Sequence, residues 1–295
     1  MLPGRRSSRG YPKWRDRRPA ESGASSIYDG EVTPPRCLSI ATSDSGGGAG
    51  IQADLKAFAA AGCHGMTAIV GVTAQNTTSV LATFALPARV VTAQLEAVYD
   101  DIGVDAAKTG ALLSVEVIGA VADFLSSHPT LLVVDPVLRA STGPALLDPE
   151  ATDVFITSLL PLATVVTPNL AEARVLAGID GDRRTLAERI VSLGARAVLI
   201  TGGEGEGSDL LFDGTDHVEI PVEWVSGTAT HGTGCTHSAT LTAELALGTP
   251  LADAARHAAA VTAAAIEHGL EGIGEGAGPV AVGQASGFSQ RVRTR

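Results

Sequence analysis

Short apolar runs recur along the chain, and each is followed by a turn and a segment with helical spacing. The six runs are 37-CLSIAT-42, 66-MTAIVGV-72, 104-VDAAKTG-110, 131-LLVVDP-136, 164-TVVTP-168 and 197-AVLITG-202. They are evenly apolar instead of alternating, which is typical of strands buried on both faces of a parallel sheet. Helical spacing is found in 51–62, 90–102, 115–127 and 170–178. This alternation predicts a doubly wound α/β sheet, in which ligands bind at the carboxyl ends of the strands.

The later part of the chain is less regular. Residues 209–225 predict an antiparallel hairpin that turns at Asp213 and Gly214, and two Ala-rich helices are expected over 235–247 and 251–269. We find no internal repeat and no linker within 37–280. We therefore expect one α/β domain over 36–282, an unfolded basic extension over 1–35 and a flexible tail over 283–295.

Charge and cysteine content limit the classes of function. The first 36 residues hold eight Lys or Arg and four Asp or Glu, which leaves 13 basic and 28 acidic residues in the rest of the chain. A body this acidic disfavours binding to nucleic acid or to anionic membranes, and no apolar run is long enough to span a bilayer. The three cysteines form no CxxC pair, so we expect a reduced, cytoplasmic protein with a small-molecule substrate.

The first 31 residues are rich in Arg, Ser, Gly and Pro and have no apolar periodicity. We expect them not to fold and to be dispensable, with the functional chain starting near Val32. A transit peptide and a nucleic-acid arm are the alternatives, although Asp16 and Glu21 interrupt the basic run.

A glycine-rich turn, 43-SDSGGGAGIQADLK-56, follows the first predicted strand. It lacks the Gly-Lys-Ser/Thr of a P-loop, and its glycines do not match GxGxxG. The adjacent glycines let a ligand lie against the backbone, and Asp44 can accept hydrogen bonds from it; the alternative is a tight turn that Asp44 merely stabilises. Gln75, after the second strand, can read a heterocycle or stabilise its own turn.

Two carboxylates follow later strands, Asp135 in 131-LLVVDPVL-138 and Glu172 in 167-TPNLAEA-173. Together they could anchor Mg²⁺ through water. Asn169 lies at the expected N-cap of a helix with Glu172 three residues later, so an ordinary capping box is the alternative.

The segment 231-HGTGCTHSATLTAEL-245 predicts a helix that begins near Gly234. Its opening N–H groups, from Gly232, Thr233 and Gly234, would bind an anion, and the helix dipole would lower the pKa of Cys235 so that it could deprotonate a hydroxyl. A cysteine nucleophile with His231 or His237 as base is an alternative. Zinc binding is another, through His231, Cys235 and His237 together with Cys63 and His64, although no fourth ligand follows at a metal-type spacing.

Lysines are scarce, since only Lys56 and Lys108 occur beyond the first 36 residues. Lys108 follows a strand and is the better candidate for a phosphate contact, although a solvated or strand-capping lysine fits equally. Magnesium and helix N-termini would then neutralise most of the phosphate charge.

The ordered segments SDSGGGAGIQADLKAF, AQNT, AAKTG, VVDPV, LPLATVVTPNLAEA and HGTGCTHSA resemble the hydroxymethylpyrimidine/phosphomethylpyrimidine kinases of thiamine biosynthesis, within the ribokinase-like superfamily. The resemblance covers residues 36 to about 280. It implies a ribokinase-like three-layer α/β sandwich with a mostly parallel sheet. It also implies that MgATP phosphorylates 4-amino-5-hydroxymethyl-2-methylpyrimidine and then its monophosphate at the same site, in a homodimer.

The resemblance also implies roles for sixteen residues. The pyrimidine would be bound by Asp44, Gly47, Gly48, Gln75, Ala111 and Val137; the nucleotide by Lys108, Asn169, Thr201 and Gly202; Mg²⁺ by Asp135 and Glu172; and the transferring group by Gly232, Thr233 and Gly234, with Cys235 as the proposed base.

Three positions depart from the family pattern. Ala111 stands where the family usually has Met, 201-TGGE-204 replaces Lys-Gly-Gly-His, and 274-GEGAGPV-280 replaces Gly-His-Gly-x-Gly-Pro. These differences leave two rivals, a pyridoxal or pyridoxine kinase and a non-catalytic pyrimidine-binding protein. A cysteine hydrolase is a third rival from another class.

Overall fold

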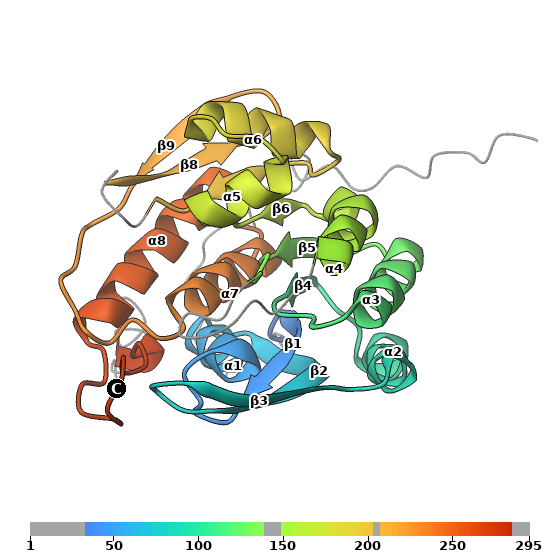
Figure 1. Cartoon of the computed structure of the whole chain (residues 1–295), viewed down its shortest axis with the longest axis horizontal. Coiled ribbons are helices and arrows are strands. Elements are labelled where there is room, and N and C mark those ends of the chain that lie inside the picture. Colours follow the sequence, from blue (N-terminus) through green and yellow to red (C-terminus); the bar gives the residue numbers. More distant parts are fainter. Residues whose placement is uncertain (1–32, 139–148, 203–206, 285–295) are drawn as a thin grey trace, which may run out of the picture. The chain divides into compact units, whose positions relative to one another are not determined.

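The computed structural model describes residues 33–138, 149–202 and 207–284 of the chain. The chain divides into a unit of residues 1–32 and a unit of residues 33–295, and everything described below belongs to the second. Within the described residues, nine strands form one sheet in the order β3-β2-β1-β4-β5-β6-β7-β8-β9 (Figure 1). The domain limits expected from the sequence stay a prediction, because both predicted extensions lie largely outside the described residues.

The strands and helices alternate through most of this unit. The strands are β1 (Arg36–Asp44), β2 (His64–Gln75), β3 (Val80–Ala85), β4 (Ala106–Thr109), β5 (Leu131–Val134), β6 (Val165–Val166), β7 (Val198–Ile200), β8 (Ser208–Phe212) and β9 (His217–Pro221). The helices are α1 (Gly50–Ala60), α2 (Ala88–Ala97), α3 (Val115–Ser127), α4 (Pro149–Val154), α5 (Leu170–Ala177), α6 (Arg183–Ser192), α7 (Thr233–Ala246) and α8 (Leu251–Glu267). Shorter turns are η2 (Val98–Ile102), η3 (Phe155–Leu159), η4 (Leu160–Leu162) and η5 (Val282–Gln284).

The centre of the sheet is parallel, as the apolar runs predict. β1 pairs in parallel with β2 on one side and with β4 on the other, and parallel pairing continues from β4 through β7. The predicted hairpin is confirmed as β8 and β9, whose turn is closed by hydrogen bonds from the N–H groups of Thr215 and Asp216 to the carboxylate of Asp213. The apolar runs do not predict β3, an antiparallel edge strand on which Leu81 and Phe84 are exposed. That strand lacks a buried face, so it gives no burial pattern to recognise.

Successive strand residues are buried on opposite faces of the sheet, under two layers of helices. Leu38 and Ile40 of β1 join a core with residues of α2, α3, α5 and α6. Cys37 and, on β5, Val133 face the other layer, where α1, α7 and α8 pack. The three-layer α/β sandwich expected from the resemblance is therefore confirmed.

Parallel pairing brings the carboxyl ends of the central strands to one edge of the sheet. Asp44 ends β1, Thr109 ends β4, Val134 ends β5 and Ile200 ends β7. Helix α7 packs against β1, β4 and β5. The N-terminus of α7 and the polar residues after each strand are thereby brought together. Among the described helices, none is both long and apolar enough to cross a membrane.

Candidate active site

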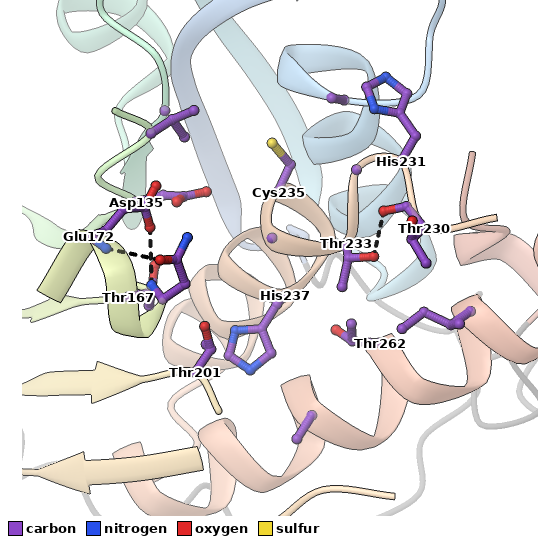
Figure 2. A pocket seen from close by; sticks show the side chains of 18 of the residues that line it. Asp135, Thr167, Glu172, Thr201, Thr230, His231, Thr233, Cys235, His237 and Thr262 are labelled. Carbon is purple, nitrogen blue, oxygen red and sulfur yellow. Dashed lines mark hydrogen bonds between the residues drawn. The ribbon is translucent and has the colours of Figure 1, made fainter. Parts of the chain in front are cut away.

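A cavity of about 1280 Å³ lies at this edge of the sheet. Its walls come from the residues after β1, β2, β4, β5, β6 and β7, from the start of α7 and from α8. Figure 2 shows Cys235 at the start of α7, with Asp135 and Glu172 to one side and His231 to the other. Of the sixteen predicted site residues, all line the cavity except Gly47, Gly48 and Lys108. The volume exceeds that of a typical single-ligand site, so the cavity has room for two molecules.

The start of α7 is held open by two glycine-rich turns that touch each other. Gly232 has φ +87°, a left-handed conformation that strongly favours glycine, and a Cβ there would collide with the carbonyl oxygen of Gly48. No side chain caps α7. The N–H of Thr233 donates to the carbonyl oxygen of Thr230 at 3.3 Å, so an anion would rely on the other opening N–H groups and on the positive end of the helix dipole. The helix start thus opens on the cavity, and anion binding by Gly232, Thr233 and Gly234 stays a prediction.

Cys235 differs from its prediction in one respect. Burial raises the pKa of its thiol to about 12, and the attraction of the Lys108 ammonium and the N–H of Gly50 only partly offset that rise. The prediction that the helix dipole would lower this pKa is therefore wrong, because the sequence shows where the helix starts and not how deeply the sulfur is covered. At neutral pH Cys235 is a thiol that lines the cavity.

Lys108 also departs from its predicted role. It is fully buried, its Nζ lies 2.8 Å from Oδ1 of Asp54 and 3.5 Å from Oδ2 of Asp135, and it does not line the cavity. Burial acts to lower the pKa of Lys108, but the neighbouring Asp54, Cys235 and Asp135 raise it above its ordinary value and keep the ammonium charged. A direct phosphate contact is therefore not supported; Lys108 acts on the site from beneath, through Asp135 and Cys235.

The sequence contains a signal for the buried pair of Lys108 and Asp54. Asp54 lies on the same helical face as Ile51 and Phe58, which are buried. An acidic residue on a buried helical face needs a partner, and Lys108 lies in a strand whose residues are all buried. Only the packing of α1 against the sheet identifies the two as partners.

Asp44 holds the glycine-rich turn together. Its Oδ1 accepts a hydrogen bond from the N–H of Gly46 at 2.7 Å, and its Oδ2 accepts from Gly48 and Ala49 at 3.0 and 2.9 Å. Nε2 of His231 lies 2.9 Å from the same Oδ2. Burial acts to raise the pKa of Asp44, but the bonds from His231 and from these N–H groups outweigh it, so the pKa lies below its ordinary value.

These contacts realise the alternative that Asp44 stabilises its own turn. Both oxygens are already engaged by protein donors, although the residue still lines the cavity. Gly47 accepts a hydrogen bond from Lys56 through its carbonyl group, and a Cβ at Gly48 would collide with the ring of His231. The two glycines therefore shape the wall without lining it, and their direct contact with a substrate is not supported.

The end of the cavity next to β1 and β4 has a mixed polar and apolar wall. Gln75, Ala111, Val137 and Leu113 line it, and the hydroxyl of Thr42 donates to the carbonyl of Ala111 at 2.8 Å. Leu113 has φ +69°, which is a strained conformation for a leucine. Leu113 is not among the predicted site residues, because no sequence signal reports such a backbone angle.

Asp135 and Glu172 face the middle of the cavity. The pKa of Glu172 is raised to about 8, by burial first and by the negative charge of Asp135 second. Asp135 accepts a hydrogen bond from the hydroxyl of Ser238 at 2.8 Å. Asn169 and Glu172 form a complete capping box at the start of α5, so the capping alternative is also confirmed. A helix cap thus holds Glu172 beside a second carboxylate, which is the donor set that Mg²⁺ prefers.

The structure does not support the zinc alternative. Among residues 33–138, 149–202 and 207–284, no three His, Cys, Asp or Glu side chains converge closely enough to hold a metal ion. Cys63 is buried and its sulfur lies 4.0 Å from the carbonyl oxygen of Ala243, while Cys235 lines the cavity. Mg²⁺ differs because one or two carboxylates are enough when phosphate and water supply the remaining ligands.

The opposite end of the cavity lies between β7, α8 and the segment after β9. Thr201 and Gly202 lie there, and Gly202 donates its N–H to Oδ1 of Asp209 at 2.8 Å. An apolar wall that the sequence analysis does not identify completes this end: Val222, Trp224, Val225, Ala259, Ala263 and Ile266. These residues come from a loop and a helix that meet only in the folded chain.

Comparison with known proteins gives a consistent result. Residues 44–281 match the sequence model of the phosphomethylpyrimidine kinase family. The chain is 49% identical over 253 residues to the hydroxymethylpyrimidine/phosphomethylpyrimidine kinase of Rhizobium meliloti, with 82% of this chain and 95% of that protein covered. It is 42% identical over 251 residues to the thiamine biosynthesis bifunctional protein of Geobacter sulfurreducens, covering 82% of this chain and 51% of that protein.

A solved structure shares the fold over most of its length. The pyridoxal kinase of Staphylococcus aureus in complex with AMP-PCP and pyridoxal superposes with a TM-score of 0.78 at 34% sequence identity. The match covers 86% of this chain and 95% of that protein. The two ligands named for that enzyme are an ATP analogue and a ring with a hydroxymethyl group.

Proposed function

The chain belongs to the phosphomethylpyrimidine kinase family, and on that premise we propose the reaction that it catalyses. It transfers the terminal phosphoryl group of ATP to the hydroxymethyl group of 4-amino-5-hydroxymethyl-2-methylpyrimidine. It then phosphorylates the resulting monophosphate to the diphosphate, as a step of thiamine biosynthesis.

One observation carries this proposal: the uncapped start of α7 lies between two chemically different ends of one cavity. The end with Gln75, Ala111 and Val137 suits a small heterocycle, because an amide can pair with ring nitrogens and the apolar groups pack on the ring. The apolar end, with Trp224 and Ile266, suits the base of a nucleotide. The N–H groups of α7 then meet the phosphoryl group that passes between the two ligands.

Magnesium fits the paired carboxylates. Two carboxyl groups close enough for one to raise the pKa of the other lower their mutual repulsion when a divalent cation binds. Asp135 and Glu172 would hold the ion, which would supply positive charge against the phosphate groups. Asn169 positions Glu172 through the helix cap.

The chain's own residues act mainly by positioning. Phosphoryl transfer proceeds through a loose transition state, so the protein supplies alignment and donors more than proton removal. With its raised pKa, Cys235 is protonated before reaction, so we assign it as a neutral group against the transferring phosphoryl group. A thiol at this point repels a phosphorylated substrate less than a carboxylate would.

Two rivals have specific observations to weigh. Ala111 leaves space beside Gln75 for a larger ring, which favours a pyridoxal kinase. A cysteine hydrolase needs a thiolate, and the raised pKa of Cys235 opposes that reading. The pyrimidine kinase reaction fits the family and the cavity together.

The test is product formation by the full chain with MgATP and three substrates in separate assays: the hydroxymethylpyrimidine, its monophosphate and pyridoxal. Mass spectrometry of the products identifies each transfer. Diphosphate from the first two supports the proposal. Phosphorylation of pyridoxal alone would assign the chain to the pyridoxal kinases, and no transfer to any substrate would favour a non-catalytic binding protein.

The setting and assembly also remain proposals. The three free cysteines fit a reduced cytoplasm, and a homodimer is consistent with the exposed Leu81 and Phe84 on β3. Light scattering of the purified chain would test the dimer, since a monomer at assay concentration contradicts it.

A further inference from the structure

His237 is a buried cavity residue to which the proposed reaction gives no role. It lies two residues after Cys235 on α7, and its side chain is directed to a different side of the helix, beside Thr201 (Figure 2). The residue is only 5% exposed, yet neither ring nitrogen makes a hydrogen bond. Its Nε2 lies 3.4 Å from Oδ2 of Asp209, which is itself buried. A buried polar ring without partners is costly, so a missing ligand is a physical explanation for it.

Asp209 fixes where this ring can act. Its other oxygen, Oδ1, accepts the N–H of Gly202 at 2.8 Å. The same carboxylate thus connects His237 to the backbone at the carboxyl end of β7. A protonated imidazole donates from both nitrogens, so one N–H can point to Asp209 while the other points to an anion in the cavity.

The charge of the cavity creates a need for such a donor. Among the described lining residues, six are acidic: Asp44, Asp135, Glu172, Asp209, Glu223 and Glu271. No lysine lines the cavity within the described part of the chain, and Lys108 is sealed beneath it.

The other basic residues in the lining are already engaged. Arg183 donates to Ser208 and pairs with Glu219, Arg174 lies 3.7 Å from Asp180, and His231 is paired with Asp44. Among the described residues, His237 therefore remains as the buried basic lining residue that makes no hydrogen bond, because Arg174 is half exposed.

We propose that His237, oriented by Asp209, binds the phosphate oxygens of the nucleotide and so helps to set the affinity for ATP. The assignment rests on the proposed kinase function. In an α-helix, side chains lean toward the N-terminus, so His237 leans toward the opening turn where the α7 N–H groups face the cavity. Imidazole and helix N-terminus then contact the same polyphosphate from adjacent positions.

The experiment compares ADP and adenosine binding to the wild-type chain and to His237→Leu, by calorimetry with Mg²⁺ and without pyrimidine. The two ligands differ only in phosphate, so they separate a phosphate contact from a contact with base or ribose. We expect the Kd for ADP to rise about tenfold, as for loss of a charged hydrogen bond, while the Kd for adenosine changes less than twofold. The KM for ATP should rise by a similar factor, with the KM for the pyrimidine unchanged.

Each contrary result has a distinct meaning. Equal ADP affinity in the two proteins would overturn the assignment of His237 alone, and so would an equal loss for ADP and adenosine. Failure of the wild-type chain to bind ADP would overturn the kinase function as well. Should His237→Leu unfold in circular dichroism, His237→Gln replaces it, because one neutral donor should weaken ADP binding by an intermediate factor.

A double-mutant cycle tests the orienting role of Asp209. Asp209→Asn keeps an acceptor for the N–H of Gly202 but removes the charge beside the ring. Its effect on ADP affinity should largely disappear when His237 is already leucine. Full additivity of the two substitutions would show that Asp209 does not act through His237.

Discussion

Asp44 lies on one side of Cys235, and the pair Asp135 and Glu172 lies on the other (Figure 2). The surroundings of Asp44 and of Glu172 shift their pKa values in opposite directions. Asp44 accepts hydrogen bonds from three backbone N–H groups and lies beside His231, so its pKa is lowered and its charge is fixed. Glu172 faces a like charge, Asp135, and its pKa is raised to about 8. The protein stabilises the charge of Asp44, whereas burial and the charge of Asp135 disfavour the ionised form of Glu172.

This difference in pKa distinguishes a carboxylate that stabilises the fold from carboxylates that bind a ligand. A satisfied carboxylate shapes the loop and gives up most of its capacity for ligands. A pair of like charges such as Asp135 and Glu172 costs stability in the free protein and recovers it when a cation binds, which is a common arrangement at functional sites.

Cys235, between the two groups, gives the largest expected effect. Cys235→Ala should lower kcat by about 100-fold and change the KM for the pyrimidine by less than threefold, because the thiol acts on the transferring group. Steady-state kinetics with MgATP measure both. An unchanged kcat would remove Cys235 from the mechanism.

Cys235→Ser is the matched variant, since it tests the protonation state. A hydroxyl is neutral like the thiol, so we expect it to retain more activity than alanine. If serine were as inactive as alanine, a thiolate base would be favoured over the neutral group that the raised pKa indicates.

Asp44→Asn removes the charge of the carboxylate that accepts the backbone hydrogen bonds of the glycine-rich turn. The amide NH₂ would face N–H donors from the loop or from His231, so we expect a loss of about 3 kcal/mol in the free energy of unfolding. Urea denaturation measures it. Asp253→Asn, in an exposed pair with Arg256, is the control and should cost less than about 0.5 kcal/mol.

The contribution of Asp44 to the free energy of unfolding should depend on pH. Its folded pKa is lowered, so its contribution is present above the unfolded value and is lost as the pH falls below it. The wild-type advantage over Asp44→Asn should therefore vanish in acid. A difference that persists at pH 2 would mean that shape, and not charge, makes the contribution.

Glu172→Gln removes the carboxylate that faces a like charge, so it should raise the free energy of unfolding, whereas Asp44→Asn lowers it. The folded pKa of Glu172 is raised to about 8, so its ionisation costs stability progressively as the pH rises from the unfolded value toward 8. Glutamine can still complete the helix cap. In EDTA we expect the variant to equal the wild type at pH 4 and to exceed it by about 2 kcal/mol at pH 9.

Magnesium should shrink that gain, and kcat of the variant should fall at least about tenfold as one carboxylate is lost. Glu96→Gln on the exposed face of α2 is the control and should match the wild type at both pH values. A variant no more stable than the wild type at pH 9 would contradict the comparison between the two groups.

The sequence predicts the positions of these residues in the fold better than it predicts their pKa values. The buried apolar runs identify the parallel strands, so Asp44, Asp135 and Thr201 are correctly placed at one edge of the sheet. The direction of a pKa shift depends on burial and on partners far away in the chain. Lys108 and Asp54 are 54 positions apart, and Asp44 and His231 are 187 apart.

The same limit explains the wrong prediction for Cys235. A helix start is visible in the sequence and indicates a lowered pKa. The burial of the sulfur and the nearby Asp54 and Asp135, which raise this pKa, depend on parts of the chain that are far away in sequence. His237 of α7 and Asp209 of β8 likewise approach each other only in the folded chain.

A substitution of Leu113 has the smallest expected effect. It tests whether the strained backbone at this position serves substrate binding. Leu113→Gly relieves a left-handed backbone worth about 1 kcal/mol but removes a half-buried side chain that packs on Gly71. We expect these terms to offset each other, so that the free energy of unfolding changes by less than about 1 kcal/mol. The KM for the pyrimidine should rise about threefold as the pocket widens, and activity on pyridoxal should rise relative to the wild type. A large loss of stability with unchanged KM would assign Leu113 to packing, and the strain at the cavity wall would then have no part in substrate choice.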